Sequence, residues 1–190
     1  MLLIVITPEQ NVADEHQIII SLLDNGLQRL HIRKLGYTEQ QMETYIKQIP
    51  VKWHNKIVVH HHSAIAQQFN LGLHVSFNNF FSYTQHSHSS LSVSVHSRDE
   101  FEKVDGKCNY AFISPVFNSI SKVGYVTNAT LIGMGNQQRT TALIALGGIT
   151  NNNIAQIQQA GFDGAAIIGS VWQTDDAVKS FIEIQNAITT

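Results

Sequence analysis

Several polar side chains that could do chemistry stand directly after short apolar runs of the chain. An arginine can hold an anion, a histidine can move a proton near neutral pH, and a serine hydroxyl can bind a phosphate. The side chains concerned are those of Thr7, Arg33, His60 to His62, His74, Ser94, His96, Ser114 and, in a polar stretch further on, Lys122. Catalytic side chains of α/β barrels come from the carboxyl ends of strands, so this pattern indicates a site at one end of a barrel.

Two glycine-bearing stretches, Ala142 to Thr150 and Gly164 to Ser170, are each an apolar run that ends in glycine. Between them, Asn151 to Gly161 has the apolar spacing of a helix and a glycine stop. Backbone N–H groups without a Cβ nearby can approach a phosphate closely, and barrel phosphate sites often follow strands seven and eight. The pattern favours a phosphate site over glycines that only form tight turns.

Alternation along the chain predicts which side chains enter the barrel. Alternate residues of a strand face the same side, so Ser92, Ser94 and His96 are expected to share one face of the strand that precedes His96. Val93 and Val95 share the other face. The valines are expected to face the helices, so the two serines and His96 are expected to point inward.

The same alternation makes His31 and Arg33 point inward together. A buried guanidinium is unfavourable unless an anion or a carboxylate pairs with it. We expect a ligand anion, because acidic residues are scarce at the predicted strand ends. A structural salt bridge with Glu9 or Asp24 is the alternative.

Histidines are frequent at these strand ends, which makes a transition-metal site an option for His60, His62, His74 and His96. His61 should point away from its two neighbours, because consecutive strand residues face opposite sides. No carboxylate accompanies the histidines there, and a buried, hydrogen-bonded histidine is commoner than a ligand. The sequence therefore predicts no metal ligands.

Eight apolar runs alternate with helical segments, at about 24 residues per unit. The expected strands are Leu2 to Ile6, Arg29 to Arg33, Lys56 to His60, Gly72 to Ser76, Leu91 to Val95 and Tyr110 to Ser114, and the last two lie in the stretches Ala142 to Thr150 and Gly164 to Ser170. No linker or charge run divides the chain. The sequence predicts one domain, residues 1–190, with the fold of a small closed (β/α)8 TIM barrel; an open doubly wound sheet is the alternative.

Local helix signals support this order. Thr38 to Gln41 and Ser97 to Glu100 both fit the capping-box pattern. The segment Phe77 to Ser90 shows neither the apolar spacing of a helix nor the alternation of a strand, and it is expected to be a loop with one helical turn.

Composition limits the partners. The formal net charge of −2 gives no electrostatic case for nucleic acid. No apolar run is long enough to span a membrane, and the N-terminal segment lacks a basic region. We expect a cytoplasmic protein that binds a small molecule, and a homodimer is compatible with the sequence.

Several motifs, in order along the chain, resemble the thiamine phosphate synthase/TenI family. They are Leu30 to Lys34 (LHIRK), Gly72 to Val75 (GLHV), Ser94 to His96 (SVH), Ser114 to Lys122 (SPVFNSISK), Ala145 to Ile149 (ALGGI) and Gly161 to Ile168 (GFDGAAII). The glycine pairs occur in many phosphate-binding barrels. The combination of Arg33, the Ser-x-His motif and the Pro-x-Phe stretch ending in Lys122 is more specific.

The resemblance implies a small α/β barrel that couples hydroxymethylpyrimidine diphosphate to thiazole phosphate, with magnesium and release of diphosphate. It assigns Arg33, Lys122 and Ser94 to the diphosphate, and Ser119 and Ser121 match threonines of the same loop. Gly147, Gly148 and the Ile168–Gly169 backbone, with Ser170 next to it, match the site for thiazole phosphate. These assignments are what the resemblance implies.

The chain departs from the family pattern where magnesium is expected. Two carboxylates stand there in family synthases, and His61 and Asn79 occupy their positions here. Mg²⁺ prefers oxygen ligands, and an imidazole is a poor substitute. Two other functions therefore stay open beside the synthase: a TenI-like thiazole tautomerase, with a histidine such as His96 moving protons, and a binder of a phosphorylated ligand without catalysis.

Overall fold

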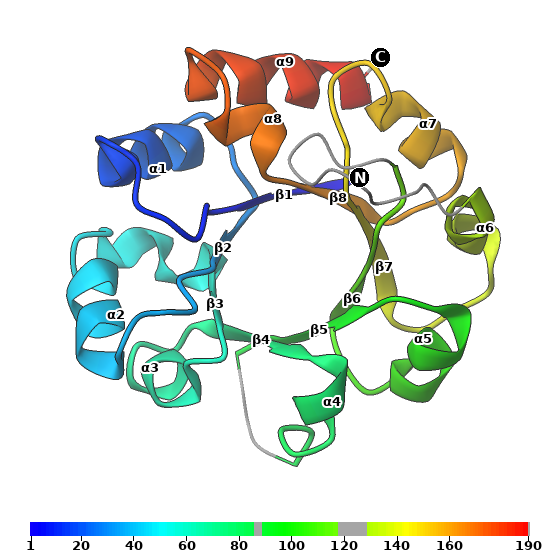
Figure 1. Cartoon of the computed structure of the whole chain (residues 1–190), viewed down its shortest axis with the longest axis horizontal. Coiled ribbons are helices and arrows are strands. Elements are labelled where there is room, and N and C mark those ends of the chain that lie inside the picture. Colours follow the sequence, from blue (N-terminus) through cyan, green and yellow to red (C-terminus); the bar gives the residue numbers. More distant parts are fainter. Residues whose placement is uncertain (86–88, 118–128, 190) are drawn as a thin grey trace.

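Eight parallel strands close into a barrel in the computed structural model, which describes residues 1–85, 89–117 and 129–189 (Figure 1). The strands run in chain order around the barrel, and β1 pairs with both β2 and β8. Their bounds are β1 Leu2–Ile6, β2 Arg29–Ile32, β3 Ile57–His60, β4 Gly72–Ser76, β5 Leu91–Val95, β6 Tyr110–Ile113, β7 Ala142–Leu146 and β8 Gly164–Ile167. The closed barrel is confirmed, and the open doubly wound sheet is wrong.

Helical segments surround the barrel and connect successive strands (Figure 1). Their bounds are α1 Glu15–Asp24, α2 Glu39–Ile46, η1 Val51–Lys56, α3 Ser63–Gln68, α4 Phe77–Phe80, α5 Arg98–Val104, α6 Ala129–Ile132, η2 Gly133–Asn136, α7 Ile154–Gln159, α8 Gly169–Trp172 and α9 Ala177–Thr189. The short helix α4 is the turn expected within Phe77 to Ser90. Among the described helices, none combines the length and the apolar character that a membrane crossing requires.

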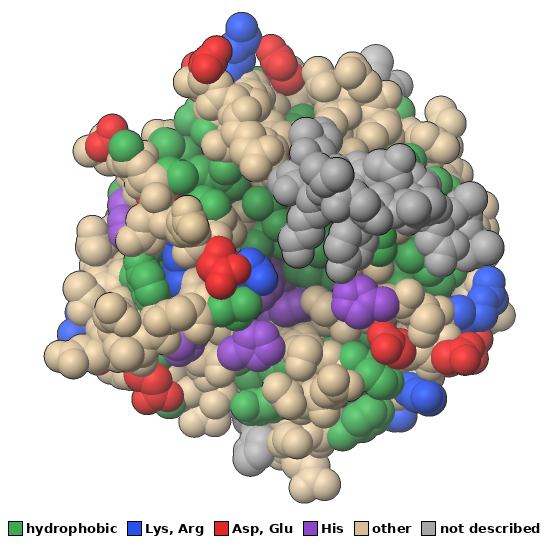
Figure 2. Space-filling model, in the orientation of Figure 1, with side chains coloured by type: hydrophobic (Ala, Val, Ile, Leu, Met, Phe, Trp, Pro, Cys, Tyr) green, Lys and Arg blue, Asp and Glu red, His purple; other side chains and the backbone are tan. Residues whose placement is uncertain are grey.

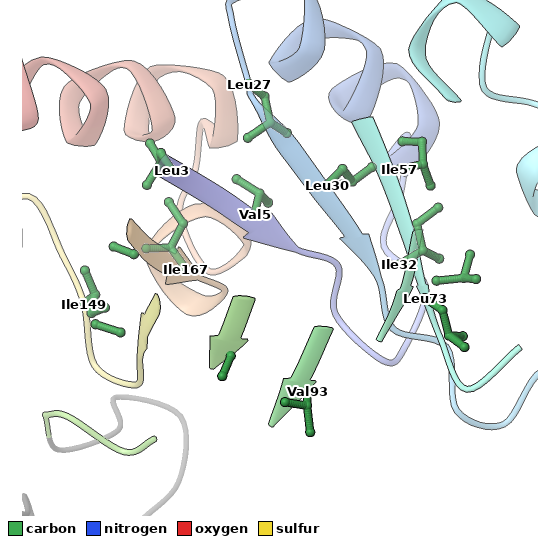
Figure 3. Packing of buried hydrophobic residues seen from close by; sticks show 14 of the residues in the cluster. Leu3, Val5, Leu27, Leu30, Ile32, Ile57, Leu73, Val93, Ile149 and Ile167 are labelled. Atoms are coloured by element: carbon green, nitrogen blue, oxygen red, sulfur yellow. The ribbon is translucent and has the colours of Figure 1, made fainter. Parts of the chain in front are cut away.

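Alternation along the strands separates two apolar layers. The larger layer lies between strands and helices, and Figure 3 shows Val5, Leu30 and Ile57 within it. The smaller layer fills the barrel and includes Ile4 and Phe112. Because successive strand residues point to opposite faces, the sequence period of two decides which layer a residue joins.

The two expected capping boxes differ in the structure. At α2, the Thr38 side chain accepts from the Gln41 N–H, and the Gln41 side chain accepts from the Thr38 N–H, so the box is complete. At α5, Ser97 accepts from the Glu100 N–H, but the Glu100 carboxylate accepts from the N–H of His96 instead. Only half of the second box forms, and its carboxylate supports the end of β5.

A buried ion pair lies outside the barrel, behind β2. The side chain of Lys34 is fully buried, and its Nζ lies 2.9 Å from the carboxylate of Glu15 in α1. The Tyr45 hydroxyl of α2 donates to the same carboxylate at 2.5 Å, and the Val12 N–H donates to it at 3.2 Å. The pair therefore joins β2, α1 and α2, with nearly every polar atom satisfied.

Candidate active site at the carboxyl ends of the strands

Arg33 lies at the end of β2, where its backbone N–H donates to Thr7 Oγ1 at 2.9 Å. Its guanidinium donates to the Glu9 carboxylate at 2.8 Å. The two side chains are 35% and 51% exposed, so the pair sits in contact with solvent rather than in the core. The salt bridge with Glu9, the alternative from the sequence, is thus the contact that forms, and an incoming anion would have to compete with this carboxylate.

The side chains of Ser92 and Ser94 in β5 point into the barrel, and those of the valines point outward, as predicted. Ser92 is fully buried inside the barrel, where its Oγ lies 2.9 Å from His74 Nδ1. Ser94 Oγ lies 2.8 Å from His74 Nε2, one layer closer to the strand end. Val93 and Val95 belong to the outer apolar layer. Ser94 is thus held by His74 on the neighbouring strand β4.

Histidines gather in the middle of the face shown in Figure 2, in the part of the view where β3, β4 and β5 lie. Beneath this face, His31 Nδ1 and His60 Nε2 are 3.0 Å apart. His31 Nε2 lies 2.6 Å from the Tyr110 hydroxyl. If Tyr110 donates to His31, then His31 donates to His60, so each nitrogen has a partner of the right kind. We call His31, His60 and His74 the histidine cluster.

The histidine cluster is neutral at neutral pH. Burial, followed by the charge of neighbouring groups such as His61 and Arg33, lowers the pKa of His74 to about 3. Burial, followed by the nearby His74, also lowers the pKa of His31 and His60 well below the ordinary value. The reason is that an imidazolium inside the barrel would lose its hydration without gaining a counter-ion.

This neutral cluster makes stability depend on pH. In the unfolded chain His74 takes up a proton near its ordinary pKa of about 6.5, whereas the folded state resists protonation until about pH 3. The unfolded state binds more protons between these values, so stability is lost as pH falls below 6.5. For His74 alone, lowering the pH from 7 to 5 should reduce the free energy of unfolding by about 2 kcal/mol.

Urea unfolding at several pH values, with a chelator present, measures this loss. The control is His74→Asn, whose amide can still bond to a serine on β5 but does not titrate. The variant should lose less stability than the parent over the same pH range. An equal loss in both proteins would contradict the assignment to His74.

His96 lies just beyond β5 and is exposed. Its Nδ1 lies 3.0 Å from the carbonyl oxygen of Ser114, which can only accept a hydrogen bond. Nδ1 therefore carries the proton, and in the neutral ring Nε2 keeps its lone pair. This arrangement suits a general base, because the backbone carbonyl of Ser114, directly after β6, selects the tautomer and holds the ring.

His61 and Asn79 are the residues that the family resemblance predicts at the positions of two magnesium carboxylates. His61 is exposed and has a left-handed backbone (φ 65°), and Asn79 lies exposed in α4. An imidazole is a poor ligand for Mg²⁺, so these two positions offer a single suitable oxygen, that of the Asn79 amide. This donor set does not fit a two-carboxylate magnesium site.

The glycine turn after β7 is tightly packed. Gly147 has φ 107°, and a Cβ there would lie 3.1 Å from Pro115. Gly148 has φ 62°, and its carbonyl accepts from the Asn153 amide at 2.9 Å. Both positions favour glycine, so the backbone itself forms this part of the rim.

The turn after β8 brings Gly169 and Ser170 to the same end of the barrel, after Ile168. Ser170 Oγ is buried and finds no hydrogen-bond partner among the described residues. A neighbouring cavity of about 310 Å³ is lined by both residues, but also by the carboxylate-bearing Glu183. That carboxylate makes the cavity unfavourable for a phosphate.

Three predicted site residues, Ser119, Ser121 and Lys122, lie outside the described residues. Tyr110, whose hydroxyl lies 2.6 Å from His31 Nε2, is a member of the interior network that was not predicted. The alternation along β6 was a usable signal for Tyr110, because Tyr110 and Phe112 face the barrel interior whereas Ala111 and Ile113 face the helices.

The fold and these strand ends define the class of small (β/α)8 barrels that bind ligands at the carboxyl ends of their strands. Within this class, residues 3–171 match the profile described as "Thiamine monophosphate synthase" (TMP-TENI). The chain belongs to this family, as the motifs around Arg33 and Gly147 had indicated. Membership supports a role in thiamine biosynthesis.

Named relatives agree with this membership. The chain is 22% identical over 194 residues to a thiamine-phosphate synthase of Leuconostoc citreum, a match that covers 93% of this chain and 92% of that protein. A thiamine phosphate pyrophosphorylase structure from Bacteroides thetaiotaomicron is 28% identical, with a TM-score of 0.82 and coverage of 100% and 98%. A pyrophosphorylase from Pyrococcus furiosus, 18% identical with a TM-score of 0.80 and coverage of 98% and 95%, shows the same fold.

Proposed function

We propose that the protein is a transferase of the thiamine phosphate synthase type, which couples hydroxymethylpyrimidine diphosphate to thiazole phosphate and releases diphosphate. The observation that supports the proposal is that Arg33 and two glycine turns lie on one rim, at two positions proposed here to bind anions. Arg33 directly follows β2, the glycine turns follow β7 and β8, and only β1 separates β2 from β8. Two phosphorylated substrates could therefore lie side by side across β1.

Each position has a role in the proposed reaction. The carbon–oxygen bond to the diphosphate breaks, a carbocation-like pyrimidine forms, and the thiazole nitrogen then bonds to that carbon. Arg33, with Lys122, would stabilise the negative charge of the leaving diphosphate, and preplaced charge of this kind lowers the barrier. Ser94, Ser119 and Ser121 would donate hydrogen bonds to the same group.

The thiazole phosphate would be held mainly by backbone. Gly147, Gly148 and the Ile168–Gly169 segment would offer backbone N–H groups, and the Ser170 hydroxyl, which has no hydrogen-bond partner among the described residues, directly follows Gly169. Magnesium is expected from the family, but no step is assigned to it, because His61 and Asn79 do not suit this ion. A cytoplasmic location and a homodimer stay predictions.

A TenI-like thiazole tautomerase is the second candidate, and His96 is the observation that favours it. Its Nδ1–H is held by the Ser114 carbonyl at 3.0 Å, so Nε2 is available to take a proton from a ring carbon. This reaction moves protons within one substrate, and it requires neither diphosphate release nor magnesium.

One assay separates these functions. Purified protein is incubated with thiazole phosphate alone and with both substrates, each with and without magnesium, and products and diphosphate are quantified. Thiamine phosphate with one diphosphate per turnover supports the transferase. Isomerised thiazole phosphate without diphosphate supports the tautomerase. If calorimetry detects binding of thiazole phosphate but no product forms, the protein is a binder, and failure to bind either substrate overturns the phosphate site.

A further inference from the structure

We propose that His31, His60 and His74 form a site for one divalent transition-metal ion of the zinc type inside the barrel. The three side chains come from neighbouring strands β2, β3 and β4, and their exposed fractions are 0%, 6% and 2%. Each can direct one ring nitrogen so that all three nitrogens lie within 4.8 Å of one another. None of them is a residue assigned to substrate, so the inference does not depend on the proposed function.

The spacing of the nitrogens suits a common ion. Tetrahedral zinc has Zn–N distances of about 2.0–2.1 Å, which puts ligand nitrogens about 3.3 Å apart. His31 Nδ1 and His60 Nε2 are already 3.0 Å apart, so a small separation of these two rings would admit the ion. The rings of His60 and His74 have centroids 4.3 Å apart, which keeps the third ligand close.

The protonation state also suits a metal. Zinc binds the neutral imidazole, and burial lowers the pKa of all three histidines. A neutral ring has one nitrogen with a free lone pair, and His31 offers Nδ1 to the ion when its proton is on Nε2, facing the Tyr110 hydroxyl. Three neutral nitrogens and no carboxylate favour a transition metal over Mg²⁺ or Ca²⁺, which prefer oxygen.

Supporting partners hold the rings in place. Metal-bound histidines generally use their second ring nitrogen to bond to another group, which fixes the ring. His31 has the Tyr110 hydroxyl at 2.6 Å from Nε2, and His74 has Ser92 and Ser94 at 2.9 and 2.8 Å. One serine bond suffices to orient His74, so its other nitrogen can turn to the ion.

Cobalt titration of the untagged full chain, after removal of metals with a chelator, tests the site. One Co²⁺ per chain should bind with the visible absorption of tetrahedral cobalt, and zinc should displace it. Loss of a group that only supports a ligand generally weakens metal binding by roughly 10–100-fold. His60→Gln removes a ligand itself, so it should weaken cobalt binding by about 100-fold or more. Tyr110→Phe, which keeps the ring in the barrel, should weaken binding by about 10-fold or more.

The control is the double variant His61→Gln/His62→Gln, which removes the histidines that follow β3 and keeps the cluster. Its cobalt affinity should match that of the parent protein. No cobalt binding by the parent would overturn the proposal and leave a hydrogen-bonded polar core. Loss of binding in the double variant, with binding intact in His60→Gln and Tyr110→Phe, would overturn it in favour of a surface site.

Discussion

Replacement of Arg33 by glutamine is expected to lower the rate of substrate coupling about 100-fold and to leave the binding of thiazole phosphate unchanged. The guanidinium lies at the end of β2, exposed enough to reach a ligand and anchored through its backbone to Thr7. Removal of one preplaced group that stabilises developing charge generally slows a reaction by about 10²- to 10³-fold. Coupling rates and calorimetric titration of diphosphate and of thiazole phosphate measure the two effects separately.

Two further variants distinguish an anion anchor from a structural salt bridge. Glu9→Gln removes the carboxylate that competes for Arg33, so diphosphate should bind more tightly in this variant. Lys52→Gln removes one positive charge from η1 and should change neither binding nor rate. If Glu9→Gln and Arg33→Gln impair the protein equally, the pair itself is what matters, and the anchor is ruled out.

Replacement of Lys34 by methionine is expected to lower the free energy of unfolding by about 3–5 kcal/mol. The lysine is fully buried against Glu15, whose side chain is only 4% exposed. Methionine has a similar shape but no charge, so the Glu15 carboxylate would keep only the Tyr45 hydroxyl and the Val12 N–H as donors. A buried carboxylate without its counter-ion is strongly destabilising, and chemical unfolding at neutral pH measures the loss.

The matched control is Lys47→Met, which breaks the exposed pair between Glu43 of α2 and Lys47, the residue directly after this helix. Solvent already screens that pair, so its loss should leave stability unchanged within error. The double variant Lys34→Met/Glu15→Gln should recover part of the stability, because it removes the unpaired charge. A Lys34→Met protein as stable as Lys47→Met would mean that water reaches Glu15.

The strands, the closed barrel and the family were available from the sequence. Apolar runs of four or five residues recur eight times with helical segments between them, and such local patterns persist in the fold because burial of one face stabilises each element. Period-two alternation also predicted correctly that Ser92 and His31 enter the barrel and that Val93 does not. Glycine at positions 147 and 148 was an equally local signal of the turn after β7, where both residues have positive φ, whereas the phosphate site there stays a prediction.

Contacts between distant residues were decided only by the tertiary structure. The sequence could put Arg33 at a strand end, but whether its partner was Glu9 or Asp24 depended on how the loop after β1 folds over the rim. It could put His31 and His60 inside, but their 3.0 Å contact depends on the register between β2 and β3. Local patterns determine each element by itself, whereas barrel closure and register determine which side chains meet, and the chemistry proposed here depends on both.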